Sequence, residues 1–200
     1  MKKIKDILYE AQYLKNLNDF QIRSSFICES LSRKKIKKLN KESLKYILAK
    51  CDENTKKWFQ KNDTLSIILA IDELLYGKAP FSHRLVEATQ ILGVSDWDIA
   101  PLLFYTAPKY FFLPCKEIVD FFNEEWGISP LQKKYIDYNN ILLKKFKSSQ
   151  ISEVYLEPID LVAAIITLKG KRTSDYNPLI DSEDKKLIDD FINSLKEKNI

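Results

Sequence analysis

Glycine is scarce in this chain, with four residues in 200: Gly77, Gly93, Gly127 and Gly170. Because the P-loop and the dinucleotide-binding turn each need closely spaced glycines, both phosphate-binding motifs are excluded. The many tight turns of a β-barrel or a β-sandwich also depend on glycine. An all-β fold is therefore disfavoured, and we expect the four glycines to mark the ends of helices.

Histidine and cysteine are also rare. The single histidine, His83, leaves no second imidazole for a catalytic triad or a zinc site. The cysteines are three in number and widely spaced, at Cys28, Cys51 and Cys115, which excludes a disulfide framework and a CxxC zinc motif. We therefore expect no metal, no cofactor and a cytoplasmic location.

Long apolar runs are absent as well. The longest spans residues 161–166, far short of the roughly 20 residues that cross a bilayer. The residues after Met1 alternate apolar with polar side chains, unlike the continuous apolar core of a secretory signal. Hydrophobic residues make up 45% of the chain and charged residues 30%, which is typical of a globular protein. We expect no membrane association.

Apolar residues recur with helical spacing along the chain, and no two-residue hairpin signal is present. We expect an all-α fold with roughly ten helices in an orthogonal array. The expected helices lie near residues 4–14, 20–31, 40–48, 58–59, 63–76, 82–92, 98–107, 114–126, 129–146, 158–169 and 182–195.

Capping residues set several of these expected boundaries. Asn40 is a good N-cap for the third helix. Residues 129–132, Ser-Pro-Leu-Gln, match a capping box with proline at the first helical position. The polar cluster at residues 16–19 is expected to end the first helix.

The helix after Gly93 has two competing starts. A start at Ser95 would put Pro101 inside the helix, where its ring and its missing N–H are unfavourable. A start at Asp98 puts Pro101 in the first turn instead. We therefore expect Asp98 to be the N-cap.

Charge is divided unevenly along the chain, although the formal net charge is only +4. Residues 33–61 hold eleven basic and three acidic residues, a local net charge of +8. Residues 63–127 hold four basic and ten acidic residues, a local net charge of −6. We expect a basic helical N-terminal layer over residues 1–62 and a main helical domain over residues 63–200.

Residues 88–103, ATQILGVSDWDIAPLL, predict a helix, a short turn at Gly93 and a second helix. The start of a helix after such a turn suits an anion, because of its dipole and free N–H groups. The segment resembles the helix-hairpin-helix element of the DNA-repair glycosylase superfamily. Residues 108–114 and 157–161 resemble later parts of the same scaffold, so the resemblance covers about residues 63–170. It implies a helical scaffold that contacts nucleic acid.

The chain departs from that superfamily where its chemistry lies. Ser95 stands in place of the second hairpin glycine, and Ile99 in place of a small residue. Cys115 lies near the position of the catalytic aspartate, with Asp120 about one turn further on. No lysine occurs between residues 90 and 105 to act as the amine nucleophile of bifunctional members. The resemblance therefore carries over the scaffold, not the reaction.

The leading interpretation is a non-catalytic protein that binds DNA or RNA without sequence specificity. Gly93, Val94 and Ser95 would form the anion-facing turn. Arginine, which reads bases better than lysine does, occurs only four times. The expected phosphate contacts are six lysines of the basic segment: Lys34, Lys35, Lys37, Lys38, Lys41 and Lys45.

Two other functions stay open. A helical protein-interaction subunit, regulatory or from a defence system, would use the acidic segment and the aromatic residues near Tyr110. A small DNA-repair-type enzyme would need Asp120 or Asp160 in an apolar pocket with a raised pKa. Each feature also has a purely structural interpretation, as a helix cap at Gly93 or a solvated lysine face. The oligomeric state is open.

The nucleic-acid hypothesis leads to a test on the basic segment. Reversing the charge of Lys37 and Lys38 to glutamate should weaken binding of an oligonucleotide and flatten its salt dependence, because fewer counterions are released. Fluorescence anisotropy at several salt concentrations measures both effects. An absence of binding to duplex and to single-stranded nucleic acid at low salt would contradict the hypothesis.

Overall fold

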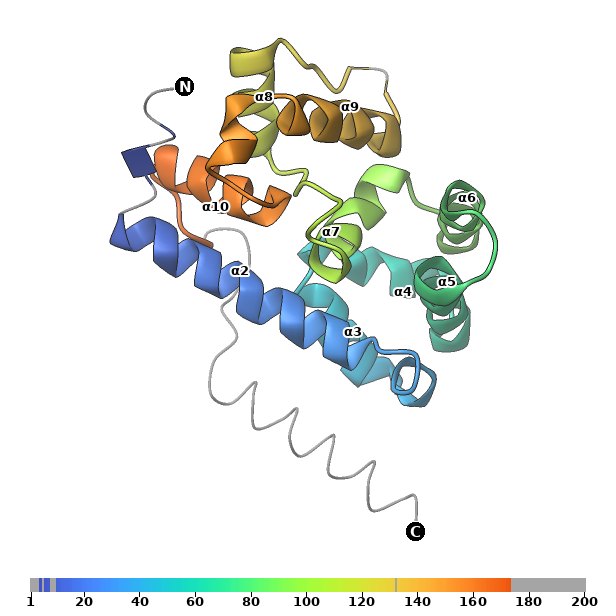
Figure 1. Ribbon diagram of the computed structural model, residues 1–200. Helices are drawn as coiled ribbons and strands as arrows, with labels where there is room; N and C mark the ends of the chain where they lie inside the picture. The colour runs from blue at the N-terminus through green and yellow to red at the C-terminus, as the bar shows by residue number, and fades with distance from the viewer. Residues whose placement is uncertain (1–3, 5, 8–9, 132, 174–200) are drawn as a thin grey trace.

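A computed structural model describes residues 4, 6–7, 10–131 and 133–173 (Figure 1). These residues contain nine α-helices and no strand, which confirms the all-α prediction. The orthogonal arrangement of the helices stays a prediction. The helix expected at residues 182–195 lies outside the described residues.

Most of the helices are short. No helix in the described ranges combines the length and the hydropathy needed to cross a lipid bilayer. The α-helices are α2 (Ala11–Ser30), α3 (Lys41–Ala49), α4 (Trp58–Lys61), α5 (Thr64–Tyr76), α6 (Phe81–Leu92), α7 (Asp96–Thr106), α8 (Lys116–Trp126), α9 (Tyr135–Lys147) and α10 (Pro158–Leu168). Three short 3₁₀ helices are η2 (Ile36–Lys38), η3 (Glu53–Lys57) and η4 (Gln150–Glu153).

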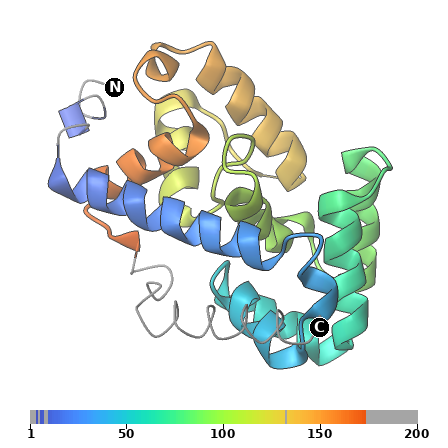
Figure 2. The same ribbon diagram turned by 60° about the horizontal axis from the view of Figure 1, so that its bottom comes forward.

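Helix α2 runs along the molecule and lies against α10 and α7 (Figures 1 and 2). Near its N-terminal end, buried Asn16 donates from Nδ2 to Thr167 Oγ1 at 3.0 Å and to the Lys171 carbonyl oxygen at 3.2 Å. Further along, the Ser24 hydroxyl donates to the Tyr105 carbonyl oxygen at 2.6 Å. The expected break at residues 16–19 is therefore wrong, because Asn16 bonds to the end of α10 instead of ending a helix.

The buried apolar side chains form one cluster with members from both sides of residue 62. Phe20 of α2 packs edge-to-face on Phe104 of α7, with ring centroids 5.7 Å apart. Trp58 of α4 is 1% exposed and belongs to the same cluster. The two expected units therefore share a core, and their division at residue 62 stays a prediction.

Several predicted helix ends are confirmed. The Asn40 side chain accepts a hydrogen bond from the Ser43 N–H at 2.8 Å and caps α3. Gly93 and Gly127 follow α6 and α8 with φ near +65°, in the left-handed region that glycine adopts without strain. Gly77 also follows a helix, α5, but with an ordinary negative φ.

The start of α7 differs from the prediction. Ser95 is the N-cap, and the expected cap Asp98 is the third helical residue instead. The two residues form a capping box: the Asp98 N–H donates to Ser95 Oγ at 3.3 Å, and the Ser95 N–H donates to Asp98 Oδ2 at 2.9 Å. Pro101 therefore lies inside the helix. The reciprocal bonds of the box offset the single backbone bond that Pro101 removes.

The start of α9 also differs from the prediction. Ser129 Oγ accepts from the Leu131 N–H, two residues ahead, at 3.2 Å. That contact closes a local turn and does not cap a helix. Helix α9 begins at Tyr135, later than the expected start at residue 129.

The buried position of Asn16 gives a stability prediction. Asn16→Asp removes the Nδ2 donor and places a carboxylate against a carbonyl oxygen, so the free energy of unfolding should fall by about 2–4 kcal/mol. Asn140→Asp, at an exposed position on α9, is the matched control and should change it by less than about 0.5 kcal/mol. Urea unfolding followed by circular dichroism measures both. Equal effects of the two substitutions would contradict the account of α2.

Candidate nucleic-acid interface

The predicted lysine run does not form one continuous patch of unpaired charge. Within it, Lys35 Nζ lies 2.7 Å from Glu29 Oε1. Lys37 Nζ lies 3.1 Å from Asp72 Oδ2 of α5. Acids of the same chain thus already face these two lysines. Four of the six predicted lysines lie between α2 and α3: Lys34, Lys35, Lys37 and Lys38.

The other two predicted lysines, Lys41 and Lys45, line a groove of about 810 Å³ between α2, α3 and α4. Lys56 of η3 is a third lysine on its lining. We call this cavity the aromatic groove, because three of its lining residues carry aromatic rings. Its apolar walls come from Phe26, Tyr46, Ile47, Ala49 and Phe59.

A second groove, of about 510 Å³, is lined by the Gly93–Ser95 turn together with Lys57 and Lys61. We call it the turn groove. A Cβ atom at Gly93 would lie 3.8 Å from the Cδ of Lys61, so the turn and this lysine are neighbours. Gln60 lines both grooves, which therefore adjoin. The predicted turn thus meets the basic segment through two lysines that are not among the six predicted phosphate contacts.

The positive side chains of the two grooves are here called the lysine surface. Lys45 Nζ lies 3.5 Å from Glu42 Oε1, and Lys56 Nζ lies 3.9 Å from Glu53 Oε2. Exposed pairs of this kind contribute at most about 1 kcal/mol and separate readily. Lys41, Lys57 and Lys61 form no ion pair with any residue in the described ranges. The lysine surface consists of Lys41, Lys45, Lys56, Lys57 and Lys61.

Two residues of the N-terminal segment hold α4 in place beside the turn. The indole of Trp58 is buried in the core. Asn62 donates from Nδ2 to the carbonyl oxygens of Trp58 and Leu92, both at 3.0 Å, and so joins the end of α4 to the end of α6. Lys57 and Lys61 are four residues apart and share the outer face of this turn of helix. The four-residue spacing of Lys57 and Lys61 is the sequence signal that predicts their shared face.

The backbone N–H groups of the Gly93–Ser95 turn already have acceptors. Those of Gly93 and Val94 donate to carbonyl oxygens of α6 at 3.3 and 3.1 Å. That of Ser95 donates to the Asp98 carboxylate at 2.9 Å. An anion bound by these three groups would have to displace internal bonds and lie beside a carboxylate. The lysines, not the turn, therefore supply the positive potential of the turn groove.

Asp160 meets one of the two requirements of the enzyme hypothesis. Burial raises the pKa of its carboxyl group above the ordinary value of 3.8. However, its Oδ2 accepts from the Glu157 N–H at 3.0 Å in the first turn of α10. Neither Asp160 nor Asp120 lines the aromatic groove or the turn groove. Burial also raises the pKa of the Cys115 thiol to about 12, which disfavours the nucleophilic thiolate at neutral pH.

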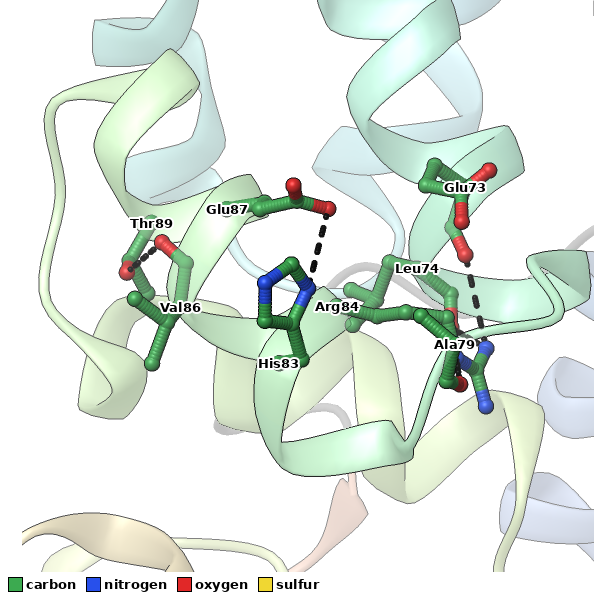
Figure 3. A network of polar contacts seen from close by, with 8 residues as sticks. All are labelled: Glu73, Leu74, Ala79, His83, Arg84, Val86, Glu87 and Thr89. Carbon is green, nitrogen blue, oxygen red and sulfur yellow. Dashed lines mark hydrogen bonds and ion pairs between the residues drawn. The ribbon is translucent and has the colours of Figure 1, made fainter.

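His83 lies on the outside of α6 in a polar network with its neighbours (Figure 3). Its Nδ1 is 3.5 Å from Glu87 Oε2, one turn along the same helix. The next residue, Arg84, donates from Nε to the Ala79 carbonyl oxygen at 2.8 Å, and from Nη1 to that of Leu74. Arg84 thereby satisfies carbonyl groups at and just beyond the end of α5. The contacts of Arg84 join the start of α6 to the end of α5. The described residues contain no group of three His, Cys, Asp or Glu side chains that could hold a metal ion.

The surface expected for a protein partner lies elsewhere. Tyr110 is 62% exposed and lines a cavity of about 360 Å³ with Phe81 and Phe111. Further apolar side chains are exposed on α5 and α6: Leu65, Leu69, Val86 and Ile91. A protein-binding role for this side of the molecule stays a prediction.

No family model, no curated protein and no solved structure matches the chain. The resemblance to the glycosylase superfamily is therefore an expectation without support from relatives.

The buried carboxyl of Asp160 gives a pH prediction. Because burial raises its pKa, the folded state favours the protonated form over the charged one. The free energy of unfolding of the wild-type chain, measured relative to that of Asp160→Asn, should be greatest below the ordinary pKa of 3.8. It should fall as the pH rises through the raised pKa of the folded state. Urea unfolding of both chains between about pH 3 and about pH 7 measures the difference. A wild-type advantage that grows with pH would contradict this account.

Proposed function

We propose that this chain binds nucleic acid without sequence specificity, through contacts between the lysine surface and the phosphate backbone. The observation that supports it most is that five lysines from α3, η3 and α4 line two adjoining grooves. Three of them have no acidic partner among the described residues. Neutralising a run of phosphates releases counterions, which favours binding at low salt.

The spread of the lysines favours a polymeric anion over a small one. Lys41 and Lys45 lie on α3, whereas Lys61 lies at the end of α4 in the other groove. A single phosphate group could contact only a few of these side chains at once. A nucleic-acid strand carries regularly spaced charges and can follow both grooves.

No arginine lines the aromatic groove or the turn groove. Arg23 is 1% exposed, with its guanidinium 5.6 Å from the ring centre of Tyr105. Arg84 is bonded to backbone carbonyl groups next to α5. Lysine is a point charge without the planar fork by which arginine reads guanine. We therefore infer phosphate binding without base readout and assign no reaction to the chain.

Reversing charge in the turn groove tests the proposal. Lys57→Glu combined with Lys61→Glu should weaken binding of a labelled oligonucleotide at least about tenfold at low salt, because two phosphate contacts are replaced by repulsion. The slope of the logarithm of affinity against the logarithm of salt concentration should become shallower by about 2. Fluorescence anisotropy with the full chain measures both quantities.

The control reverses two exposed lysines of α9, Lys144 and Lys145. Helix α9 lies across the molecule from α3 and α4 (Figures 1 and 2). This variant has the same net charge as the test variant. It should lose little affinity, since it leaves the lysine surface intact. An equal loss in both variants, or no binding by the wild-type chain at low salt, would contradict the proposal.

A further inference from the structure

The aromatic groove has more apolar wall than phosphate binding alone requires. Phe26 and Tyr46 pack edge-to-face with ring centroids 6.4 Å apart and form part of its lining. Phe59 lines the groove from α4 and is only partly buried. Lys45 Nζ lies 5.7 Å from the centre of the Phe59 ring, so positive charge and an aromatic side chain meet at one place.

We propose that the aromatic groove receives an unpaired nucleobase, so that the nucleic acid bound by this chain is single-stranded. This inference rests on the proposed function and names the class of nucleic acid. A duplex stacks its bases inside and presents mainly phosphates, which would leave an apolar cavity of about 810 Å³ unfilled. A single strand exposes the faces of its bases, which can stack on aromatic side chains.

The arrangement of charge around the groove fits such a strand. Lys41, Lys45 and Lys56 share the lining of the aromatic groove with its aromatic rings. Gln60 connects this groove to the turn groove, where the next lysines lie. A backbone that follows the lysines can therefore place a base against Phe59 without leaving the positive surface. Basic grooves interleaved with aromatic rings are typical of proteins that bind single strands.

Base identity should matter little. Stacking uses the ring face that every base has, and it discriminates weakly among them. Besides its three lysines, the groove has four polar lining residues, Ser30, Glu42, Ser43 and Gln60. We therefore expect a site that selects for unpaired bases and tolerates any sequence.

The test substitutes Phe59 by leucine, which keeps an apolar side chain but removes the aromatic face. Phe81→Leu is the matched control, because Phe81 is also partly buried and aromatic but lines a different cavity. The full chain is titrated against a labelled oligothymidylate and against a mixed-sequence duplex of equal length. Phe59→Leu should weaken binding of the single strand about 5- to 10-fold and leave duplex binding unchanged. Phe81→Leu should change neither.

The two proposals fail in different ways. If single strand and duplex bind equally and Phe59→Leu changes neither, this inference is overturned, while a loss of binding in the Lys57 and Lys61 variant keeps the phosphate proposal. If neither nucleic acid binds at low salt, both proposals are overturned. A peptide of residues 182–200 gives a further outcome. If it binds the chain, and Phe59→Leu weakens binding of the peptide but not of the oligonucleotide, the aromatic groove binds a peptide and this inference is overturned.

A second measurement needs no variant. Oligonucleotides carrying 5-iododeoxyuridine form covalent links to nearby aromatic side chains on irradiation. With the wild-type chain, mass spectrometry should map the link to Phe59 or Tyr46. Links confined to aromatic residues outside the aromatic groove, such as Tyr110, would overturn the inference.

Discussion

The register of α2 on α10 and α7 is the constraint on which the rest of this fold depends. Asn16 and Ser24 are buried polar side chains, and their partners are fixed atoms near the ends of α10 and α7. A buried polar group without a partner costs about 1–3 kcal/mol, so a shift of α2 by one turn would be strongly disfavoured. The same register presents Phe26 and Ser30 to the aromatic groove.

The lysine surface exists because burial of one aromatic side chain outweighs the repulsion among exposed charges. Burying a large side chain such as Trp58 contributes about 1.5–3 kcal/mol, whereas a like-charge pair four residues apart costs about 0.2–0.5 kcal/mol. Helix α4 is therefore oriented by Trp58, and Asn62 ties its end to α6. Lys57 and Lys61 are left facing outward, beside the Gly93 turn.

Much of the helical fold can be predicted from local patterns. Apolar spacing indicates the helices of the described range, and Asn40 marks the start of α3 correctly. The error at residues 16–19 lies where a polar side chain has a partner that local sequence does not reveal. The polar residues around Asn16 indicate a helix end, whereas Asn16 lies inside α2 and donates to Thr167, a partner 151 residues away in the sequence. For the candidate site, the densest run of lysines in the sequence predicts phosphate contacts at residues 34–38. The packing of α2, α3 and α4 decides instead which lysines line the two grooves.

The central claim is that a nucleic-acid strand lies on the lysine surface, and amine footprinting tests it most directly. The wild-type chain is acetylated briefly with and without a bound oligonucleotide, and each lysine is quantified by mass spectrometry. The account predicts protection of Lys57, Lys61 and Lys41 by the oligonucleotide, with unchanged reaction at Lys144 and Lys145 of α9. Uniform protection of all lysines, or protection confined to α9, would contradict it.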